Sequence, residues 1–511
     1  MERYSDSWNQ KQAELKHIDA ELRSLPDIPT QLLGGTGGLL LLNLHAKDER
    51  SIYVRWPEDE WVDLVALIPA RNLDSPGLDL EFGIPGSFVI DLLDRDGQPV
   101  FTVAEEPHAH TRPIQRGFPF FYSLPSPVKA RGIRIHCRDP QEQFFSNGRM
   151  LAMAWSELFC FTHDHNVAAG ASVTYSGTTS PTENWHWNLD FLTDGMTPLG
   201  LPEIPGKEIH TDIGWLSHPK ETAQYEISVE IDFESPKLMD GISMFPAQRP
   251  TFGVSPGLGL PQRFRLDVID PQGESRTILN RTATALRNPG DNPFVFRFPE
   301  IRAKKIRLVC PEIWTAYPHD NAFLGFSEIQ ILHGQTNIAV GAHVSVSDKA
   351  GKVRAHHDLY WDEQSLTDGF GPKGKLVSRR EWLEKLNQRL ALETRQLQVE
   401  QEVEAIIARW RRNMMTGVSA LTLIALMGLL VLPIRYRIHE RRKLQQLRRR
   451  IADDLHDEVG ANLGSIAGST ELLEEITENP LPKQQELMHD IANTAKKTAS
   501  ETRLLIHLRF F

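Results

Sequence analysis

The residue best suited to chemistry in this chain is His456, which stands in a charged stretch beside Asp457 and Glu458. A neutral imidazole carries a nitrogen lone pair that can attack phosphorus, and an adjacent carboxylate can orient the ring and take its N–H proton. These residue types suit a phosphoryl acceptor with His456 as the nucleophile and a neighbouring carboxylate as its base. The alternative is an ordinary surface histidine on a charged helix, and residue types alone do not decide between the two.

The sequence around His456 has the pattern of a long amphipathic helix. The apolar positions recur every three or four residues, as in a coiled-coil or bundle seam: Leu444, Leu447, Ile451, Leu455, Val459, Leu463, Ile466, Thr470, Leu473 and Ile476. Residues 479–482 (NPLP) end this helix, and a second amphipathic stretch follows. A single hairpin cannot bury such a stripe, so we predict that two copies of 435–511 form a homodimeric four-helix bundle.

The run RRRIADDLHDEVGANLGSI at 448–466 closely resembles the phosphoacceptor helix of sensor histidine kinases of the nitrate-sensor and desaturase-thermosensor class. The resemblance covers about 441–508. It implies that His456 is the autophosphorylation site, that Asp457 is the general base and that a response regulator is the partner. The family's common phosphatase motif has Gln where this chain has Ala461, which puts phosphatase activity by that route in doubt.

In that family an ATP-binding domain with an Asn box and Gly-rich boxes follows the second helix. Phosphoryl transfer needs the nucleotide and Mg²⁺ that such a domain holds. No comparable segment is readable in this sequence, whose last residue is Phe511. We therefore expect this chain alone to bind no cofactor, with ATP and Mg²⁺ supplied by a missing or separate domain.

A transmembrane helix is predicted over 413–434, where 22 residues without a charge separate Arg412 from Arg435. A buried core helix is the alternative. Four arginines lie in 395–412 and eight basic residues in 435–450, so the C-terminal side is expected in the cytoplasm and the N-terminal part outside a cell inner (plasma) membrane. An exported part needs a signal peptide, which the first residues do not resemble. Either the true start lies upstream, which we expect, or the predicted topology is wrong.

Most of the chain before this helix reads as a repeat with a period near 170 residues. Similar segments occur in the same order at 62–71 and 239–249, 88–98 and 264–274, 128–137 and 301–310, and 190–195 and 364–369. The segments are short, rich in Val, Ile and Phe, and separated by turns rich in Pro, Gly and Asp. This pattern predicts duplicated all-β sandwich or jelly-roll domains.

The order N-x-A-x-G, LTDG, Trp215–Ser217, the strand at 231–233 and FSEIQI resembles discoidin or coagulation-factor type C domains. That resemblance implies a galactose-binding-like jelly roll, and ligands such as glycans, lipid head groups or other proteins. Trp185, Trp187 and Trp215 are the expected ligand contacts, because exposed indole faces suit sugar surfaces. The alternative is that these rings fill the sandwich core.

Composition excludes several classes of protein. The net charge of −11 argues against direct nucleic-acid binding, and three cysteines exclude a disulfide framework or a cysteine-rich zinc module. We expect no metal site.

The second functional hypothesis is a membrane-anchored carbohydrate-binding or adhesion protein whose cytoplasmic helices only dimerise. The predicted order is a helical segment (1–34), a first jelly roll (35–165), a discoidin-like domain (166–335), a partial third repeat (336–377), a juxtamembrane helix (378–412), the span (413–434) and the phosphoacceptor hairpin (435–511).

Overall fold

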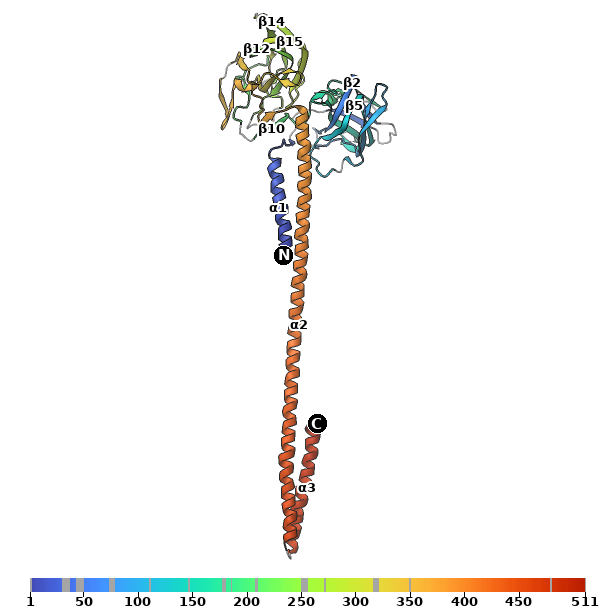
Figure 1. Cartoon of the computed structure of the whole chain (residues 1–511), viewed down its shortest axis with the longest axis vertical. Coiled ribbons are helices and arrows are strands. Elements are labelled where there is room, and N and C mark those ends of the chain that lie inside the picture. Colours follow the sequence, from blue (N-terminus) through green and yellow to red (C-terminus); the bar gives the residue numbers. More distant parts are fainter. Residues whose placement is uncertain are drawn as a thin grey trace. The chain divides into compact units, whose positions relative to one another are not determined.

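The computed structural model of the chain divides into two compact units, Met1–Val403 and Glu404–Phe511. The first unit holds two antiparallel β domains with their flanking helices, and the second is helical (Figure 1). The residues described are 2–29, 37–42, 50–72, 79–109, 112–145, 148–176, 181–184, 186–206, 210–249, 256–270, 273–315, 321–348, 351–477 and 480–510.

The first sandwich is built on long antiparallel strands that bend. Its strands are β1 (Gly38–Leu42), β2 (Ser51–Pro69), β3 (Ser87–Leu93), β4 (Pro99–Glu106), β5 (Phe120–Asp139), β6 (Gln141–Phe145), β7 (Gly148–Thr162), β8 (His165–Asn166) and β9 (Ser172–Ser176). The order is β1-β7-β2-β5-β3-β4, with β6 and β8 on β7 and β9 on β2. The register of β2 against β5 shifts between Arg55 and Glu60, so that the first part of β2 pairs with β9 and its last part with β7.

Apolar side chains on the inner faces of these strands make the core. Phe88, Phe120 and Trp155, from three different strands, meet edge to face with ring centroids 5.1 to 5.6 Å apart. Each ring is buried. Edge-to-face contact of this kind adds to the stabilisation that burial alone supplies.

The second sandwich repeats this arrangement. Its strands are β11 (Trp215–Leu216), β12 (Ile227–Pro246), β13 (Arg263–Ile269), β14 (Ser275–Arg281), β15 (Phe294–Glu312), β16 (Gly325–His333), β17 (Thr336–Asn337) and β18 (His343–Val346). The order β11-β16-β12-β15-β13-β14 matches that of the first sandwich, and β12 has its own register shift between Asp232 and Lys237. The repeat expected from the sequence is thus present in the strand order.

The boundaries between the repeats differ from the expected ones. β9 pairs with β2 and β18 pairs with β12, so each N-x-A-x-G motif completes the sandwich that precedes it. Divisions at 165/166 and 335/336 would cut both sheets. The residues predicted as a partial third repeat (336–377) therefore belong to the second sandwich. They include the 3-10 helix η3 (Glu363–Thr367), whose counterpart in the first sandwich is η2 (Leu189–Leu192).

The chain leaves the second sandwich through a short strand and enters a long helix. β21 (Gly374–Leu376) pairs with β10 (Glu203–Pro205), and β19 (Val353–His356) pairs with β20 (Leu359–Trp361). Helix α2 (Arg379–Ile476) begins after Ser378, whose hydroxyl accepts a hydrogen bond from the Glu381 amide at 3.2 Å. Ser378 is therefore the N-cap of α2. The predicted juxtamembrane helix and span are parts of this one helix.

Helix α1 (Glu2–Leu22) packs antiparallel to the first turns of α2. Lys11 pairs with Glu402 at 2.7 Å, and Glu14 pairs with Arg395 at 2.6 Å. At the other end of α1, the carbonyl oxygen of Leu22 accepts a hydrogen bond from Arg389 at 3.2 Å. Residue numbers rise along one helix as they fall along the other, which fixes the antiparallel direction.

In the second unit, α3 (Pro482–Phe510) folds back against the last part of α2. Lys496 of α3 forms an ion pair with Glu471 of α2. A groove between them is lined by apolar side chains that include Leu463, Ile466 and Ile491. The structure thus contains the helical hairpin predicted from the two amphipathic stretches.

Candidate functional site

His456 lies on α2 with its side chain 46% exposed. Its Nδ1 is 3.2 Å from Oδ1 of Asp457, whose side chain is 87% exposed. When Nδ1 donates its proton in this contact, Nε2 keeps its lone pair. The contact thus orients the imidazole and directs its nucleophilic nitrogen away from the carboxylate, as a phosphoryl acceptor requires.

The apolar seam of the second unit is largely uncovered in the single chain. Leu444, Leu455, Ile466 and Ile476 each remain between 39% and 73% exposed, although small residues such as Ala467 are buried. A contiguous apolar stripe of this kind marks an interaction surface. Within the described residues of one copy, α3 covers only part of it.

α2 also contains the apolar segment expected to span a membrane. Its most apolar window has a mean hydropathy of 2.3, and none of that window is buried. A core helix would bury this surface, and a signal sequence would lie near the N-terminus. By length and composition, this part of α2 can cross a bilayer.

The three predicted ligand tryptophans have different positions. Trp185 lies outside the described residues. Trp187 is half-buried and packs on Phe82 with ring centroids 5.7 Å apart. Trp215 has no exposed surface and belongs to the core of the second sandwich. Its indole face is therefore packed against protein and is not presented to a ligand, which corrects the expectation for this residue.

Each sandwich buries a glutamate that the sequence reading missed. Glu157 accepts a hydrogen bond from the Gly195 amide at 3.0 Å, and Glu328 accepts one from Gly369 at 3.2 Å. Burial is the main cause that raises the pKa of both carboxyls well above the usual value, and the carboxylate of the nearby LTDG aspartate raises it further. The signal for this pair was the repeated Ser-Glu dipeptide on β7 and β16.

The two LTDG aspartates, Asp194 and Asp368, hold turns. Each accepts a hydrogen bond at 2.8 Å from the backbone amide two residues ahead. Burial raises the pKa of Asp194 to about 6. Among the described residues, no three His, Cys, Asp or Glu side chains converge as metal ligands would.

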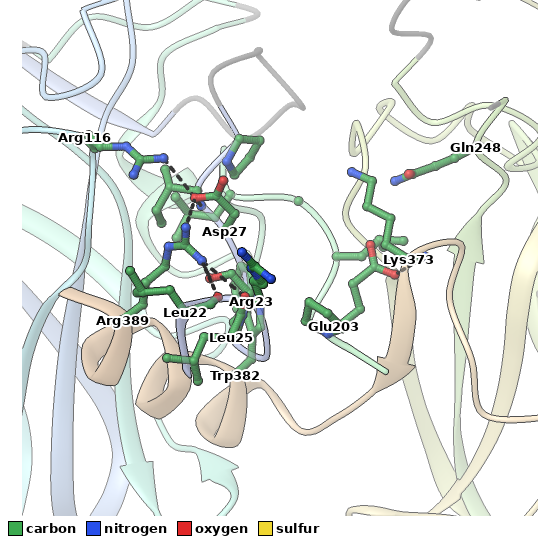
Figure 2. A pocket seen from close by; sticks show the side chains of 17 residues that line it. Leu22, Arg23, Leu25, Asp27, Arg116, Glu203, Gln248, Lys373, Trp382 and Arg389 are labelled. Atoms are coloured by element: carbon green, nitrogen blue, oxygen red, sulfur yellow. Dashed lines mark hydrogen bonds and ion pairs between the residues drawn. The ribbon is translucent and has the colours of Figure 1, made fainter. Parts of the chain in front are cut away.

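A cleft of about 630 Å³ in the first unit was not predicted. On one side, Asp27 lies between Arg116 and Arg389, at 2.9 Å and 3.2 Å (Figure 2). On the other side are Glu203 and Lys373 (Figure 2). The lining residues come from segments more than 300 positions apart in the chain, so no local sequence pattern signals the cleft.

Comparison with known families identifies the region that carries His456. Residues 448–508 match the family HisKA_3, described as histidine kinase. These residues form a histidine-kinase phosphoacceptor domain. Domains of this family typically dimerise and pair with response regulators. No curated protein matches the chain.

Several solved structures are similar to the β domains. One is CpGH89CBM32-5 from Clostridium perfringens, in complex with GalNAc-beta-1,3-galactose, at 14% identity and a TM-score of 0.17, covering 23% of this chain and 68% of that one. Another contains the CBM32-1 and CBM32-2 domains of Clostridium perfringens ZmpB, at 10% identity and a TM-score of 0.16, covering 62% and 96%. A third is the structure named as a putative alpha-L-fucosidase from Bacteroides ovatus ATCC 8483, at 12% identity and a TM-score of 0.16, covering 58% of this chain and 39% of that one.

Proposed function

We propose that the chain is the sensing and phosphoacceptor part of a membrane sensor histidine kinase. The observation that carries this proposal is the exposed His456 beside Asp457 within the region that matches the phosphoacceptor family. The two sandwiches are the extracytoplasmic sensor, with glycans among the expected ligands. The apolar part of α2 is the single span of the inner (plasma) membrane.

In the proposed reaction, Nε2 of His456 attacks the γ-phosphorus of ATP. The N–P bond forms as the bond from phosphorus to the bridging oxygen breaks, and ADP leaves. Asp457, 3.2 Å from Nδ1, takes the Nδ1 proton, which keeps the phosphoimidazole neutral at its ring. The phosphoryl group then passes to an aspartate of a response regulator. We expect ATP and Mg²⁺ to be held by a domain outside these 511 residues.

Dimerisation follows from the exposed seam on α2. Two hairpins that pack their seams together form a four-helix bundle, which removes the apolar stripe from water. His456 follows the seam residue Leu455 and so lies at the margin of that bundle, where an incoming domain can reach it. Basic residues support a cytoplasmic bundle, because eight lie within 435–450 and four within 395–412.

The test is phosphorylation of the full chain in lipid nanodiscs. A separate histidine-kinase catalytic domain supplies the donor site, with radiolabelled ATP and Mg²⁺. We expect acid-labile, alkali-stable phosphate on the wild-type chain and none on His456→Gln. The matched control is His439→Gln, another exposed histidine of α2, which should be labelled normally. Asp457→Asn should slow labelling at least about a hundredfold.

A wild-type chain that takes no label from any competent catalytic domain, or a His456→Gln chain that is still labelled, would reject the phosphoacceptor role. The adhesion hypothesis would then stand, with the hairpin serving only to dimerise. Under that hypothesis, His456→Gln leaves function unchanged.

A further inference from the structure

The cleft in the first unit has the size of a small-molecule site. Its volume of about 630 Å³ lies within the range of roughly 300 to 1,000 Å³ that such sites occupy. Part of its lining is apolar, from the buried side chains of Leu25, Ile28 and Trp382. The remainder is charged or polar, which suits a ligand with an organic body and ionised ends.

Asp27, an acidic residue of the cleft, already forms ion pairs with neighbouring arginines. Asp27 bridges Arg116 and Arg389 (Figure 2). Glu393 accepts hydrogen bonds from the same two guanidinium groups at 2.7 to 3.0 Å. These two arginines are thus neutralised by protein carboxylates. They contribute little net charge to a ligand in the cleft.

Glu203 on the opposite wall is buried and accepts a hydrogen bond from the Lys373 amide at 3.0 Å. Burial raises the pKa of Glu203 to about 7, so near neutral pH this carboxyl carries only part of a negative charge. The wall is therefore less acidic than its composition indicates.

Two cations of the cleft remain available. Arg23 and Lys373 are exposed, and within the described part of the chain neither side chain has a direct hydrogen bond or ion pair. Burial raises the pKa of Glu203 and of Asp291, and the Lys373 charge acts through space to lower the pKa of both carboxyls, so Lys373 is the more shielded of the two cations. Figure 2 shows them on opposite sides of the cleft. Arg23 lies on the side of Asp27 and Arg389, and Lys373 lies beside Glu203. A molecule with one anionic group at each end could pair with both at once.

We propose that this cleft binds a small organic dianion of the dicarboxylate class, with one carboxylate on Arg23 and the other on Lys373. The apolar lining holds the carbon chain between them. Gln248 lies on the Lys373 side (Figure 2), where its Nε2 already donates one hydrogen bond to Asp291 at 3.2 Å and keeps a second N–H for a hydroxyl or carboxylate oxygen. The bound molecule contacts both the second sandwich and the first turns of α2, through Lys373 and Trp382 respectively.

The position of the cleft gives such a ligand a route to the long helix. Trp382 and Arg389 of α2 line it, as do Leu22 and Arg23 at the end of α1. A ligand whose contacts depend on both walls stabilises the arrangement in which they are correctly spaced. Binding itself does not depend on phosphorylation, and only the last step, from α2 to His456, rests on the proposed function.

Binding is tested by calorimetry with the full chain in nanodiscs and three probes that share a six-carbon chain. Galactarate is a dianion with four hydroxyls, adipate is a dianion without them, and galactitol has the hydroxyls without the charges. We expect both dianions to bind and galactitol not to bind. Galactitol binding as tightly as galactarate, or no binding of either dianion, would overturn the proposal.

Variants locate the site. Arg23→Gln and Lys373→Gln should each weaken dianion binding about tenfold, because each removes one charge-assisted contact. Lys16→Gln on α1 and Lys375→Gln on β21 are matched controls, since both are exposed and neither lines the cleft. Equal affinities of the two cleft variants and the two controls would place the dianion elsewhere and refute this site.

Lys373→Arg keeps the charge and should keep the affinity, which separates lost binding from lost folding. Galactarate should also slow amide hydrogen exchange over residues 379–390. Unchanged exchange in a chain that binds galactarate would refute the coupling to α2. These readouts are independent of labelling at His456, so either proposal can fail alone.

Discussion

Replacing Arg389 with methionine should release α1 from α2. Arg389 is mostly buried, with 13% of its side chain exposed, and its Nε donates to Glu393 at 2.7 Å. Its Nη1 donates to the carbonyl oxygens of Leu22, Leu25 and Pro26 at 3.2 to 3.5 Å. These carbonyls lie at the C-terminal end of α1 and in the turn after it, where the helical amide pattern stops; the Leu22 carbonyl also accepts a hydrogen bond from the Leu25 amide at 3.3 Å.

The expected magnitude follows from those contacts. Hydrogen bonds to a charged group each contribute about 1.5 to 3 kcal/mol. Methionine retains much of the apolar volume of the arginine stem, while Glu393 keeps Arg116 as a partner. We therefore expect docking of α1 to weaken by about 2 kcal/mol, which corresponds to a roughly 30-fold larger population of the undocked state.

The assay is hydrogen exchange with mass spectrometry on the full chain in nanodiscs. Exchange over residues 2–22 should accelerate by up to about 30-fold in Arg389→Met, while the strands of both sandwiches stay protected. Lys385→Met, on the same helix, should leave α1 protected, because within the described residues the Lys385 side chain donates a hydrogen bond only to Gln388, at 3.4 Å, on α2 itself. Unchanged exchange of α1 in Arg389→Met, or loss of protection throughout both sandwiches, would refute the reasoning.

Three further outcomes are expected. Since burial raises the pKa of Glu203 from 4.5 to about 7, its protonated form favours folding; the stabilisation is complete below pH 4.5 and is lost as pH rises through 7. Glu203 should therefore account for about 3 kcal/mol of the stability lost in urea unfolding between pH 4.5 and 8, and the loss in Glu203→Gln should be smaller than in the wild type by about that amount. The raised pKa values of Glu157, Glu328 and Asp194 leave a remaining loss in the variant. Gly214→Ala should cost about 3 kcal/mol or more in thermal unfolding, because φ is +105° and a Cβ would lie 2.2 Å from the Phe326 carbonyl oxygen. Gly273→Ala, with φ +88° and open space, should cost only about 1 to 2 kcal/mol. Ile466→Asp should convert a dimer into a monomer in sedimentation velocity, since it places a charge in the predicted seam; a persistent dimer would argue against that packing.

The sequence carried enough information for the elements that depend on local pattern. The seam from Leu444 to Ile476 predicted the helix that bears His456, and the proline-containing turn predicted where α3 begins. The duplicated segments predicted two domains with one strand order. In each case the signal was the spacing of residue types within a short window, which the folded chain preserves.

The sequence carried less information about pairings between distant segments. The motif at 166–176 resembles the opening of a domain, yet β9 closes the sandwich before it by pairing with β2. A strand pairs with whichever sheet edge still has an unpaired strand, and the order of residues along the chain does not show which sheet offers that edge. Trp215 was misjudged for a related reason, since it is buried in a core formed by strands that follow it in the chain, among them its pairing partner β16. Arg23 and Lys373 are 350 positions apart in the sequence, and they line the same cleft only because the folded chain brings these segments together.

The first unit receives the chain through α1 and releases it through α2, and these two helices run side by side in opposite directions. Salt bridges such as that between Glu14 and Arg395 stabilise the packing of α1 against α2. When the two chain ends of a domain lie close together, the domain can be inserted into a helical hairpin of another protein without distorting either connecting segment. Residues 2–403 should accordingly be portable, so that this unit can be joined to a different protein through its two helical ends.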